Sequence, residues 1–424
     1  MTATDISLTR EERAAIATKV KSLILSKHVN VANPKQDYGP WAGEFNARMN
    51  DLIDAPSRDA FESKVSSLLQ TLGSSHTAFY HKVGDRVPVQ HAINSSLRSL
   101  EIKNSRCWVF LNVIEDGPAH RAGIKTGDIL YACDGRTLEP PSAPRFQLGG
   151  KHELQVGNLE DSSTRRVAVE IPNRAAKDRP PMIEPKSVTY RVVAPDTGFV
   201  RVASFPGAVG LDFARALDSA ISALKQQGCS RLVIDLRGNI GGGLGSLRLM
   251  SYLCPGRLPI GYSMSRTGIT QGWRKEKLPK IGSIPSNKLG LIGMALKFKI
   301  LHRDRSMVLQ TEGLGKQPFH GHVVVLVDEF SHSAAEMVAA FAKEYKLAVL
   351  VGNRTAGEVL GGANFRVGNG YYLRMPIAGW YTWQGPCIEG VGVSPDIAID
   401  IDPAELARGK DVQLEKALET VASL

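Results

Sequence analysis

One serine of this 424-residue chain stands where a nucleophile would stand. Ser333 follows the continuous apolar run Val323–Val327, which is typical of a buried parallel strand. A helical pattern begins directly behind it with two small residues, Ala334 and Ala335. The hydroxyl would therefore lie at the positive end of a helix dipole, beside free backbone N–H groups that could hold an oxyanion.

The same residues also fit a purely structural explanation. Ser333-Ala334-Ala335-Glu336 is a capping box, in which the serine caps the helix and the glutamate reaches back to the first residue. On this stretch alone, capping is the more common role for such a serine. The other chemistry-bearing residues of the chain have to decide between the two interpretations.

His76 has the most suggestive context among the ten histidines. It lies just past the predicted end of a helix, next to the hydroxyl of Ser75, and loops held by rigid elements often carry functional residues. His81 is its nearest rival. His332 is adjacent to Ser333 in sequence, but neighbouring side chains usually diverge, so we expect His332 to be a poor base for that serine.

A glycine cluster follows the predicted buried strand Leu232–Leu236. The cluster, which ends in Gly241-Gly242-Gly243, lacks the lysine and hydroxyl that close a phosphate-binding loop. Glycines at the carboxyl end of a strand allow backbone N–H groups to face a ligand. Gly241 and Gly242 could therefore contribute to oxyanion binding, and a plain tight turn is the structural alternative.

The surrounding pattern predicts a multidomain α/β protein. Residues 1–86 are predicted to form a helical domain that carries the Ser-His pair, with a buried helical face on Phe61, Val65, Leu68, Leu69 and Leu72. Residues 87–172 are rich in short strands and turns. Residues 173–424 alternate strands with helices, as α/β cores do, and Asn369-Gly370 is a strong hairpin signal.

The β-rich region carries small residues and glycines at several fixed offsets. Gly117-Pro118-Ala119 and the stretch Gly123-Ile124-Lys125-Thr126-Gly127-Asp128 closely resemble a PDZ domain of the bacterial protease type. Such domains add a peptide as an extra strand at a sheet edge. The stretch that matches the family's carboxylate-binding loop, Ile93–Leu97, has no glycine and departs from that pattern.

The composition narrows the classes of function. The chain is 43% hydrophobic and 22% charged, as soluble globular proteins are, and has no run long enough to span a bilayer. Its first residues lack the apolar segment of a signal peptide. The five cysteines form no zinc spacing, and their scatter suits reduced thiols, so we expect a cytoplasmic protein without a metal.

Positive charge is concentrated in one segment. The chain carries a formal charge of +10, and residues 255–319 hold twelve lysines or arginines against three acids, a surplus of nine (12 − 3). A solvated surface insertion would explain this segment. A basic flap that attracts an acidic peptide or an anionic surface would also explain it. Nucleic-acid binding is not expected, because no nucleic-acid fold signature accompanies the charge.

Taken together, these motifs resemble the carboxyl-terminal processing proteases, also called tail-specific proteases. Three stretches of the α/β core carry the resemblance: Asp235-Leu236-Arg237-Gly238-Asn239, Ser331-His332-Ser333-Ala334-Ala335-Glu336 and Glu389-Gly390-Val391-Gly392-Val393. The resemblance implies an N-terminal helical cap, a PDZ-like module and an α/β catalytic core of the ClpP/crotonase-like type.

One position departs from the best-known branch of that family, in which a lysine follows the glycine of the Thr355-Ala356-Gly357 stretch and acts as the base. Here that position is Glu358, which we expect to be exposed or to pair with Arg354. The chain instead looks like the tricorn-protease branch, where a histidine in a Ser-His motif is the base and an acid near the C-terminus completes the site.

This second resemblance implies the residues of a serine-protease site. Ser333 would be the nucleophile and His76 its base, with Glu389 and Ser75 orienting the imidazole. The backbone N–H groups of Ala334 and of Gly241 or Gly242 would hold the oxyanion. From the reference pKa of histidine, activity is expected to rise through roughly pH 6 to 7.5.

The leading hypothesis is therefore a serine endopeptidase that acts on extended polypeptides, C-terminal processing included, without a cofactor and with oligomerisation left open. A non-catalytic binder of peptides or lipophilic ligands is the alternative, because retinoid-binding proteins of the eye share this core fold. An enzyme of the same fold that hydrolyses small esters or tripeptides is a third hypothesis.

Overall fold

The computed structural model describes ten stretches of the chain: residues 8–31, 35–82, 86–102, 104–158, 163–173, 182–207, 209–285, 288–300, 305–385 and 387–424. Residues 174–181, which follow the predicted start of the α/β core at residue 173, lie outside the described stretches. Within these stretches, no helix combines the length and the apolar character that crossing a bilayer requires.

The apolar run before Ser333 is strand β16 (Val323–Val327), and every residue of it is buried. It lies inside a six-stranded sheet of order β10-β11-β12-β16-β17-β20, in which only the edge strand β10 is antiparallel to its neighbour. The other strands are β10 (Val188–Ala194), β11 (Thr197–Val202), β12 (Arg231–Asp235), β17 (Val349–Gly352) and β20 (Ile397–Ala398).

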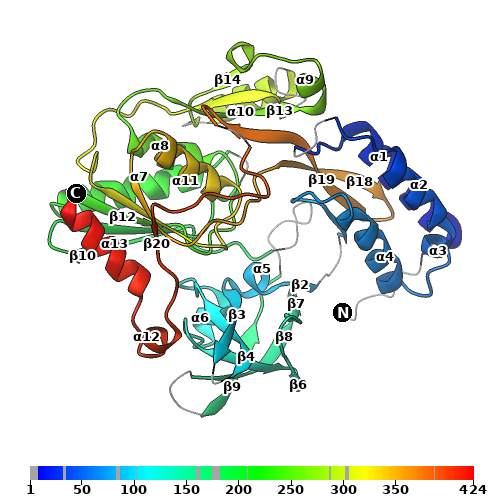
Figure 1. Ribbon diagram of the computed structural model, residues 1–424, viewed down its shortest axis with the longest axis horizontal. Coiled ribbons are helices and arrows are strands. Elements are labelled where there is room, and N and C mark those ends of the chain that lie inside the picture. The colour runs from blue at the N-terminus through cyan, green and yellow to red at the C-terminus, as the bar shows by residue number, and fades with distance from the viewer. Residues whose placement is uncertain are drawn as a thin grey trace.

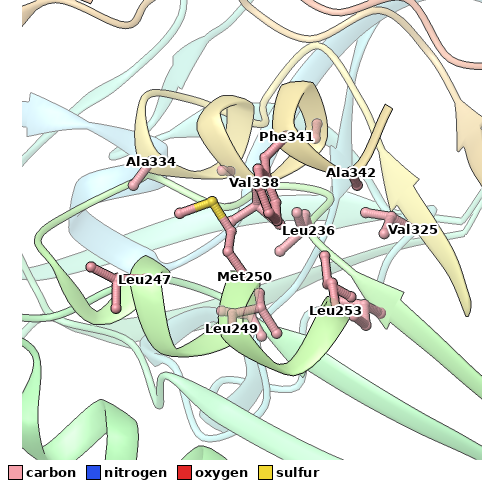
Figure 2. Close-up of a cluster of buried hydrophobic side chains, with 14 of the residues drawn as sticks. Leu236, Leu247, Leu249, Met250, Leu253, Val325, Ala334, Val338, Phe341 and Ala342 are labelled. Carbon is pink, nitrogen blue, oxygen red and sulfur yellow. The ribbon is translucent and has the colours of Figure 1, made fainter. Parts of the chain in front are cut away.

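Helices cover both faces of this sheet, which explains why its central strands are apolar throughout. Val323, Val325 and Val327 pack with three helices on one face, α7 (Leu211–Gln226), α8 (Gly245–Leu253) and α11 (Ala334–Glu344). Figure 2 shows α8 and α11 enclosing Met250, Val338 and Phe341. Val324 and Leu326 face the opposite side and pack on the C-terminal helix α13 (Val412–Ser423).

A second six-stranded sheet joins parts of the chain that are far apart in sequence. Its order is β1-β19-β13-β15-β14, and β18 also pairs with β19. The strands are β1 (Ala78–His81), β13 (Pro259–Ser265), β14 (Lys280–Ile281), β15 (Met307–Gln310), β18 (Gly361–Gly368) and β19 (Tyr371–Thr382). The predicted Asn369-Gly370 hairpin connects β18 to β19.

The N-terminal helices pack against this second sheet (Figure 1). They are α1 (Arg10–Lys27), α2 (Gly39–Ala47), α3 (Met49–Ile53) and α4 (Arg58–Gln70). The predicted apolar face of α4 is buried together with Tyr371, Leu373 and Met375 of β19. This packing places β1, and with it the Ser75-His76 turn, against the C-terminal half of the chain.

Residues 87–172 hold a separate sheet and core. Five strands run in the order β3-β4-β5-β8-β9, β6 pairs with β5, and β2 pairs with β7. Their bounds are β2 (Arg86–Pro88), β3 (Ser96–Ile102), β4 (Ser105–Leu111), β5 (Ile129–Cys133), β6 (Arg136–Thr137), β7 (Arg145–Gln147), β8 (Lys151–Gly157) and β9 (Thr164–Glu170). The short helices α5 (Val89–Ile93) and α6 (Pro118–Arg121) complete this region, which lies at the bottom of Figure 1.

The basic segment 255–319 is more than a surface insertion. It supplies β13, β14 and β15, and β13 pairs directly with the long strand β19. The remaining parts include α9 (Arg266–Thr270), the 3₁₀ helix η1 (Lys275–Lys277) and α10 (Lys288–Ile300). Residues 286–287 and 301–304 lie outside the described part. Helix α12 (Pro403–Ala407) belongs to the connection that leads to α13.

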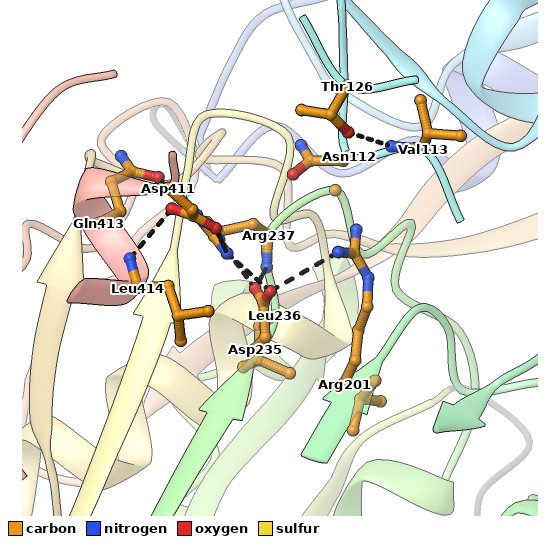
Figure 3. A network of polar contacts seen from close by, with 12 residues as sticks. Asn112, Val113, Thr126, Arg201, Asp235, Leu236, Arg237, Asp411, Gln413 and Leu414 are labelled. Atoms are coloured by element: carbon orange, nitrogen blue, oxygen red, sulfur yellow. Dashed lines mark hydrogen bonds and ion pairs between the residues drawn. The ribbon is translucent and has the colours of Figure 1, made fainter. Parts of the chain in front are cut away.

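An ionic network closes the end of β12, next to the glycine cluster (Figure 3). The Asp235 carboxylate is completely buried and accepts hydrogen bonds from the Arg237 Nε (3.0 Å) and Nη2 (2.9 Å) atoms. Arg237 also donates to Asp411 at 2.7 Å, and Arg201 lies 3.6 Å from Asp235. Burial alone would raise the pKa of Asp235, but the positive charges of Arg237 and Arg201 outweigh it and lower that pKa.

Replacing Asp235 by asparagine is expected to destabilise the fold by about 3 kcal/mol, because the buried Arg237 and the partly buried Arg201 lose a charged partner. Urea denaturation measures this change. Asp212→Asn is the matched control, since that side chain is 98% exposed. Equal unfolding midpoints for the two variants would contradict the importance of the network.

Candidate active site

Ser333 occupies the sharp turn between β16 and α11 in a strained backbone conformation. Its φ of 54° and ψ of −112° lie in a region that residues with a side chain rarely adopt. The Ser333 N–H donates to the Glu336 Oε2 atom at 3.1 Å, which is the glutamate half of the predicted capping box. Strain of this kind persists only where the surroundings hold it in place.

The glycine cluster supplies part of those surroundings. A Cβ atom at Gly241 would lie 2.7 Å from the Ser333 Cβ and 3.2 Å from the Ala334 nitrogen, so only glycine fits there. Gly242, with a φ of 141°, leaves equally little space, because a Cβ would lie 2.0 Å from the Phe205 carbonyl oxygen. The loop backbone therefore runs in direct contact with Ser333.

The N–H of Ala334, together with that of Gly241 or Gly242, was expected to hold the oxyanion, and these three groups differ in availability. The Gly241 N–H donates to the Asn239 Oδ1 atom at 2.7 Å and is therefore occupied. The N–H groups of Ala334 and Gly242 have no hydrogen-bond partner in the part of the chain that the structure describes. Two of the three predicted donors thus remain open.

The structure brings Ser75, His76 and Glu389 together. The Ser75 Oγ and His76 Nδ1 atoms lie 2.9 Å apart. Glu389 accepts the backbone N–H of Ser75 at 3.0 Å through Oε1 and that of Val359 at 2.8 Å through Oε2. His76 itself has a positive φ of 58°, so this turn is tightly constrained.

His76 carries a neutral imidazole over most of the pH range. Burial and the nearby charge of Arg374 lower its pKa, Glu358 opposes both, and the resulting pKa is about 4. Among the residues described, no hydrogen bond joins His76 to Ser333. The charge of His332, the neighbour of Ser333 in sequence, also lowers the pKa of His76.

His332 forms an ion pair with an acid of the 355–358 loop. Its Nδ1 atom lies 3.2 Å from the Glu358 Oε2 atom. The pairing with His332 lowers the pKa of Glu358; for His332, burial is outweighed by Glu358, and the pKa is raised. Glu358 is 49% exposed, as expected, but its partner is His332 and not Arg354.

Glu336 does more than the sequence suggested. Its side chain is completely buried and accepts hydrogen bonds from the Thr355 hydroxyl (2.6 Å) and from the N–H groups of Gly357 (2.6 Å) and Glu358 (2.7 Å), besides that of Ser333. One carboxylate therefore ties the 355–358 loop to the Ser333 turn. The capping-box pattern predicted the contact of Glu336 with Ser333, but no local sequence signal predicts its contacts with the 355–358 loop.

Two further residues near His76 escaped the sequence analysis. Arg374 of β19 is partly buried, and no carboxylate or other hydrogen-bonding partner for it occurs among the described residues. A Cβ at Gly362 would lie 3.3 Å from the Arg374 Nε and 3.5 Å from the His76 Cβ, so glycine leaves room for both side chains. His91 of α5 is the other residue, and burial, His332 and Arg374 lower its pKa to about 4.

One group of side chains has the composition of a metal site. The ligand atoms of Cys133, Asp134 and His152 lie within 4.8 Å of one another, and no other such group occurs in the described stretches. His152 already pairs with Asp134 at 2.7 Å, which explains the arrangement without an ion. The group belongs to the sheet of residues 87–172 and not to the Ser333 turn.

Comparisons with known proteins agree with this architecture. Residues 196–399, which include Ser333, match the model of the family described as Peptidase family S41. The chain is 23% identical over 414 residues to the chloroplastic carboxyl-terminal-processing peptidase 3 of Arabidopsis thaliana, covering 92% of this chain and 70% of that protein. It is 24% identical over 388 residues to a putative tricorn protease homolog 2 of Streptomyces coelicolor, covering 87% of this chain but 29% of that protein.

A solved structure extends the likeness to three dimensions. The photosystem II D1 C-terminal processing protease superposes with a TM-score of 0.55 and 18% identity, covering 95% of this chain and 98% of that one. At this identity the superposition shows a shared fold. The family-model match and the curated relative together support a serine peptidase. The match to the Peptidase family S41 model covers residues 196–399, just under half of the chain.

Replacing Glu336 by glutamine is expected to destabilise the protein by about 2–3 kcal/mol, because the amide cannot accept from four donors and brings an NH₂ group against them. Thermal or urea unfolding measures the loss. Glu115→Gln, at an exposed position, is the control. A Glu336→Gln variant as stable as the control would show that the buried carboxylate does not hold the two loops.

Proposed function

We propose that the chain hydrolyses peptide bonds of extended polypeptides, including bonds near their C-termini, with Ser333 as nucleophile and His76 as general base. The observation that carries this proposal is the chain of contacts from Glu389 to Ser75 to the His76 Nδ1 atom. It orients an imidazole that burial keeps neutral. A neutral imidazole with a fixed Nδ1 can take a proton on Nε2, as the serine-protease mechanism requires.

In the first step, the Ser333 Oγ attacks the scissile carbonyl and the His76 Nε2 accepts the hydroxyl proton. The strained turn presents the hydroxyl at the start of α11. The open N–H groups of Ala334 and Gly242 supply the donors for the oxyanion. Catalytic hydrogen bonds often tighten only when substrate binds, so the missing Ser333–His76 bond is compatible with this role.

His76 then gives the proton to the leaving amine, which completes the acyl-enzyme, and in the second half of the reaction water hydrolyses that acyl-enzyme. Burial raises the pKa of Glu389, and the hydrogen bonds that it accepts from Val359 and Ser75 oppose this rise and favour its charged form. That carboxylate in turn favours the imidazolium that forms on His76. Ser75 is therefore the intermediary between the acid and the base.

The position of the base supports the tricorn-like branch. Glu358 stands where the best-known branch has its lysine, and it pairs with His332. The likeness to the Streptomyces coelicolor tricorn homologue is consistent with this assignment. We infer that the Glu358–His332 pair replaces the lysine structurally and leaves the base function to His76.

We further propose that residues 87–172 form a PDZ-like module that guides polypeptide to the site, and that residues 173–424 form a core of the ClpP/crotonase-like type. The sheet of the module packs its own core, and α5 brings His91 toward the Ser333 turn. The free cysteines suit a reducing compartment such as the cytoplasm. Assembly into oligomers is compatible with this arrangement.

A fluorophosphonate probe is expected to label Ser333 covalently in the wild-type chain. Ser333→Ala should abolish labelling, and His76→Ala should slow it by about 10² to 10⁴-fold because general-base catalysis is lost. Mass spectrometry of the labelled peptide locates the adduct. Ser219→Ala and His120→Ala, at exposed positions, are the matched controls.

The same experiment separates the alternatives. No adduct in folded wild-type protein would favour the non-catalytic peptide- or lipophile-binding hypothesis. Normal labelling of His76→Ala together with lost labelling of His91→Ala would show that His91, and not His76, is the general base. A wild-type protein that the probe labels, and that without the probe cleaves small esters or tripeptides but not longer peptides, would favour the third hypothesis.

The pH dependence predicted from sequence requires correction. With a His76 pKa of about 4, the base is already neutral at pH 6, so kcat/KM should stay level from neutral pH and decline only as the pH approaches 4. Arg374→Met removes a positive charge that lowers this pKa, so the decline should begin at higher pH. Arg374→Lys keeps the charge and should restore the wild-type profile.

Measuring kcat/KM against pH for the three proteins tests this account. A wild-type profile that rises between pH 6 and 7.5, and that Arg374→Met does not move, would contradict it. A base that titrates near pH 9 or above would point to a lysine, whose reference pKa is roughly 10.4.

A further inference from the structure

Helix α10 presents a stripe of large apolar side chains to solvent. Leu289, Ile292, Leu296 and Ile300 are 80%, 57%, 53% and 72% exposed. Their spacing of three, four and four residues places them on one face of the helix. Met294, on the other side, packs against the main core, so the helix is anchored with its apolar stripe outward.

Basic residues accompany the stripe. The sequence of α10 contains three lysines and no acid, and the segment 255–319 has a surplus of nine positive charges (12 − 3). Lys297 is exposed beside the apolar stripe. Large exposed apolar side chains interleaved with lysines are typical of helices that lie in a membrane interface.

A hollow continues this surface at the C-terminal end of α10. It measures about 930 Å³, and Ile300 belongs both to its lining and to the stripe. Trp273, 40% exposed, lines it together with the basic residues Lys27, Arg274 and Lys277. Tryptophan and basic side chains are enriched at the boundary between hydrocarbon and lipid headgroups.

Helix α1, through Lys27, and the segment 255–319 thus contribute to one surface. Figure 1 shows α10 grouped with α9, β13 and β14 at the top, away from residues 87–172 at the bottom and from α13 at the left. We call it the α10 surface and define it by the stripe, Lys297 and the lining of the hollow: Leu289, Ile292, Leu296, Lys297, Ile300, Trp273, Lys27, Arg274 and Lys277.

We infer that the α10 surface docks the protein peripherally on an anionic lipid bilayer. The apolar stripe would enter the boundary between headgroups and acyl chains, and Trp273 would lie at headgroup level. Lys27, Arg274 and Lys277 would contact lipid phosphates. Apolar insertion and attraction to anionic lipid act together in such docking, and the α10 surface supplies both.

Charge argues against a second copy of this chain as the occupant. Two α10 surfaces placed face to face would bring like charges together, which opposes association. An acidic peptide would satisfy the lysines and arginines. It would leave most of the apolar stripe in water, however, whereas a bilayer covers both parts of the surface.

Vesicle co-sedimentation of the full chain tests the inference. The protein should bind vesicles of phosphatidylcholine with about 30% phosphatidylglycerol and bind pure phosphatidylcholine weakly, and salt should weaken the binding. Ile292→Glu and Leu296→Glu should each reduce binding by about tenfold or more, because a carboxylate enters the stripe. Val192→Glu, at a 41% exposed position of β10, is the matched control and should bind as the wild type does.

Circular dichroism and the unfolding midpoint show that each variant is folded before its binding is compared. Equal binding by Leu296→Glu and Val192→Glu would overturn the inference, as would equal binding to charged and uncharged vesicles. Light scattering measures the oligomeric state and so tests whether a second copy of the chain occupies the α10 surface. A dimer that Leu296→Glu dissociates, with no vesicle binding by the wild type, would assign the surface to a second copy.

Discussion

The strained backbone of Ser333 is the constraint on which the site depends. A residue with a side chain does not hold a φ of 54° and a ψ of −112° unless its neighbours prevent relaxation. Two contacts do so here. The Gly241 backbone leaves no space on one side, and the buried carboxylate of Glu336 binds the Ser333 N–H on the other. The packing of the fold thus holds Ser333 in a strained conformation that places its hydroxyl at a helix N-terminus.

The second sheet explains how distant parts of the chain meet. Strand β1 pairs with β19, so the turn that carries Ser75 and His76 is fixed next to the hairpin that follows the 355–358 loop. Glu389 then accepts from both Ser75 and Val359 and ties that turn to the same loop. The proposed base and the proposed nucleophile are therefore positioned by different sheets that one loop connects.

Much of this arrangement was predictable from sequence because its signals are local. The apolar run before Ser333, the helical face of α4 and the Asn369-Gly370 turn each depend on neighbouring residues, and each occurs as expected. Arg374 and His91 were not predictable, since their roles depend on a strand pairing and on domain packing. The pH range expected for activity was too high for the same reason. It used the reference pKa of histidine, which does not include the effect of burial on His76.

The most direct test is a crystal structure of the protein with a peptide aldehyde, which forms a reversible covalent adduct with an activated serine. The account predicts a bond to the Ser333 Oγ, the His76 Nε2 within hydrogen-bond distance of it, and the adduct oxygen facing the Ala334 and Gly242 N–H groups. An unmodified Ser333, or an adduct with another histidine in the place of His76, would contradict it.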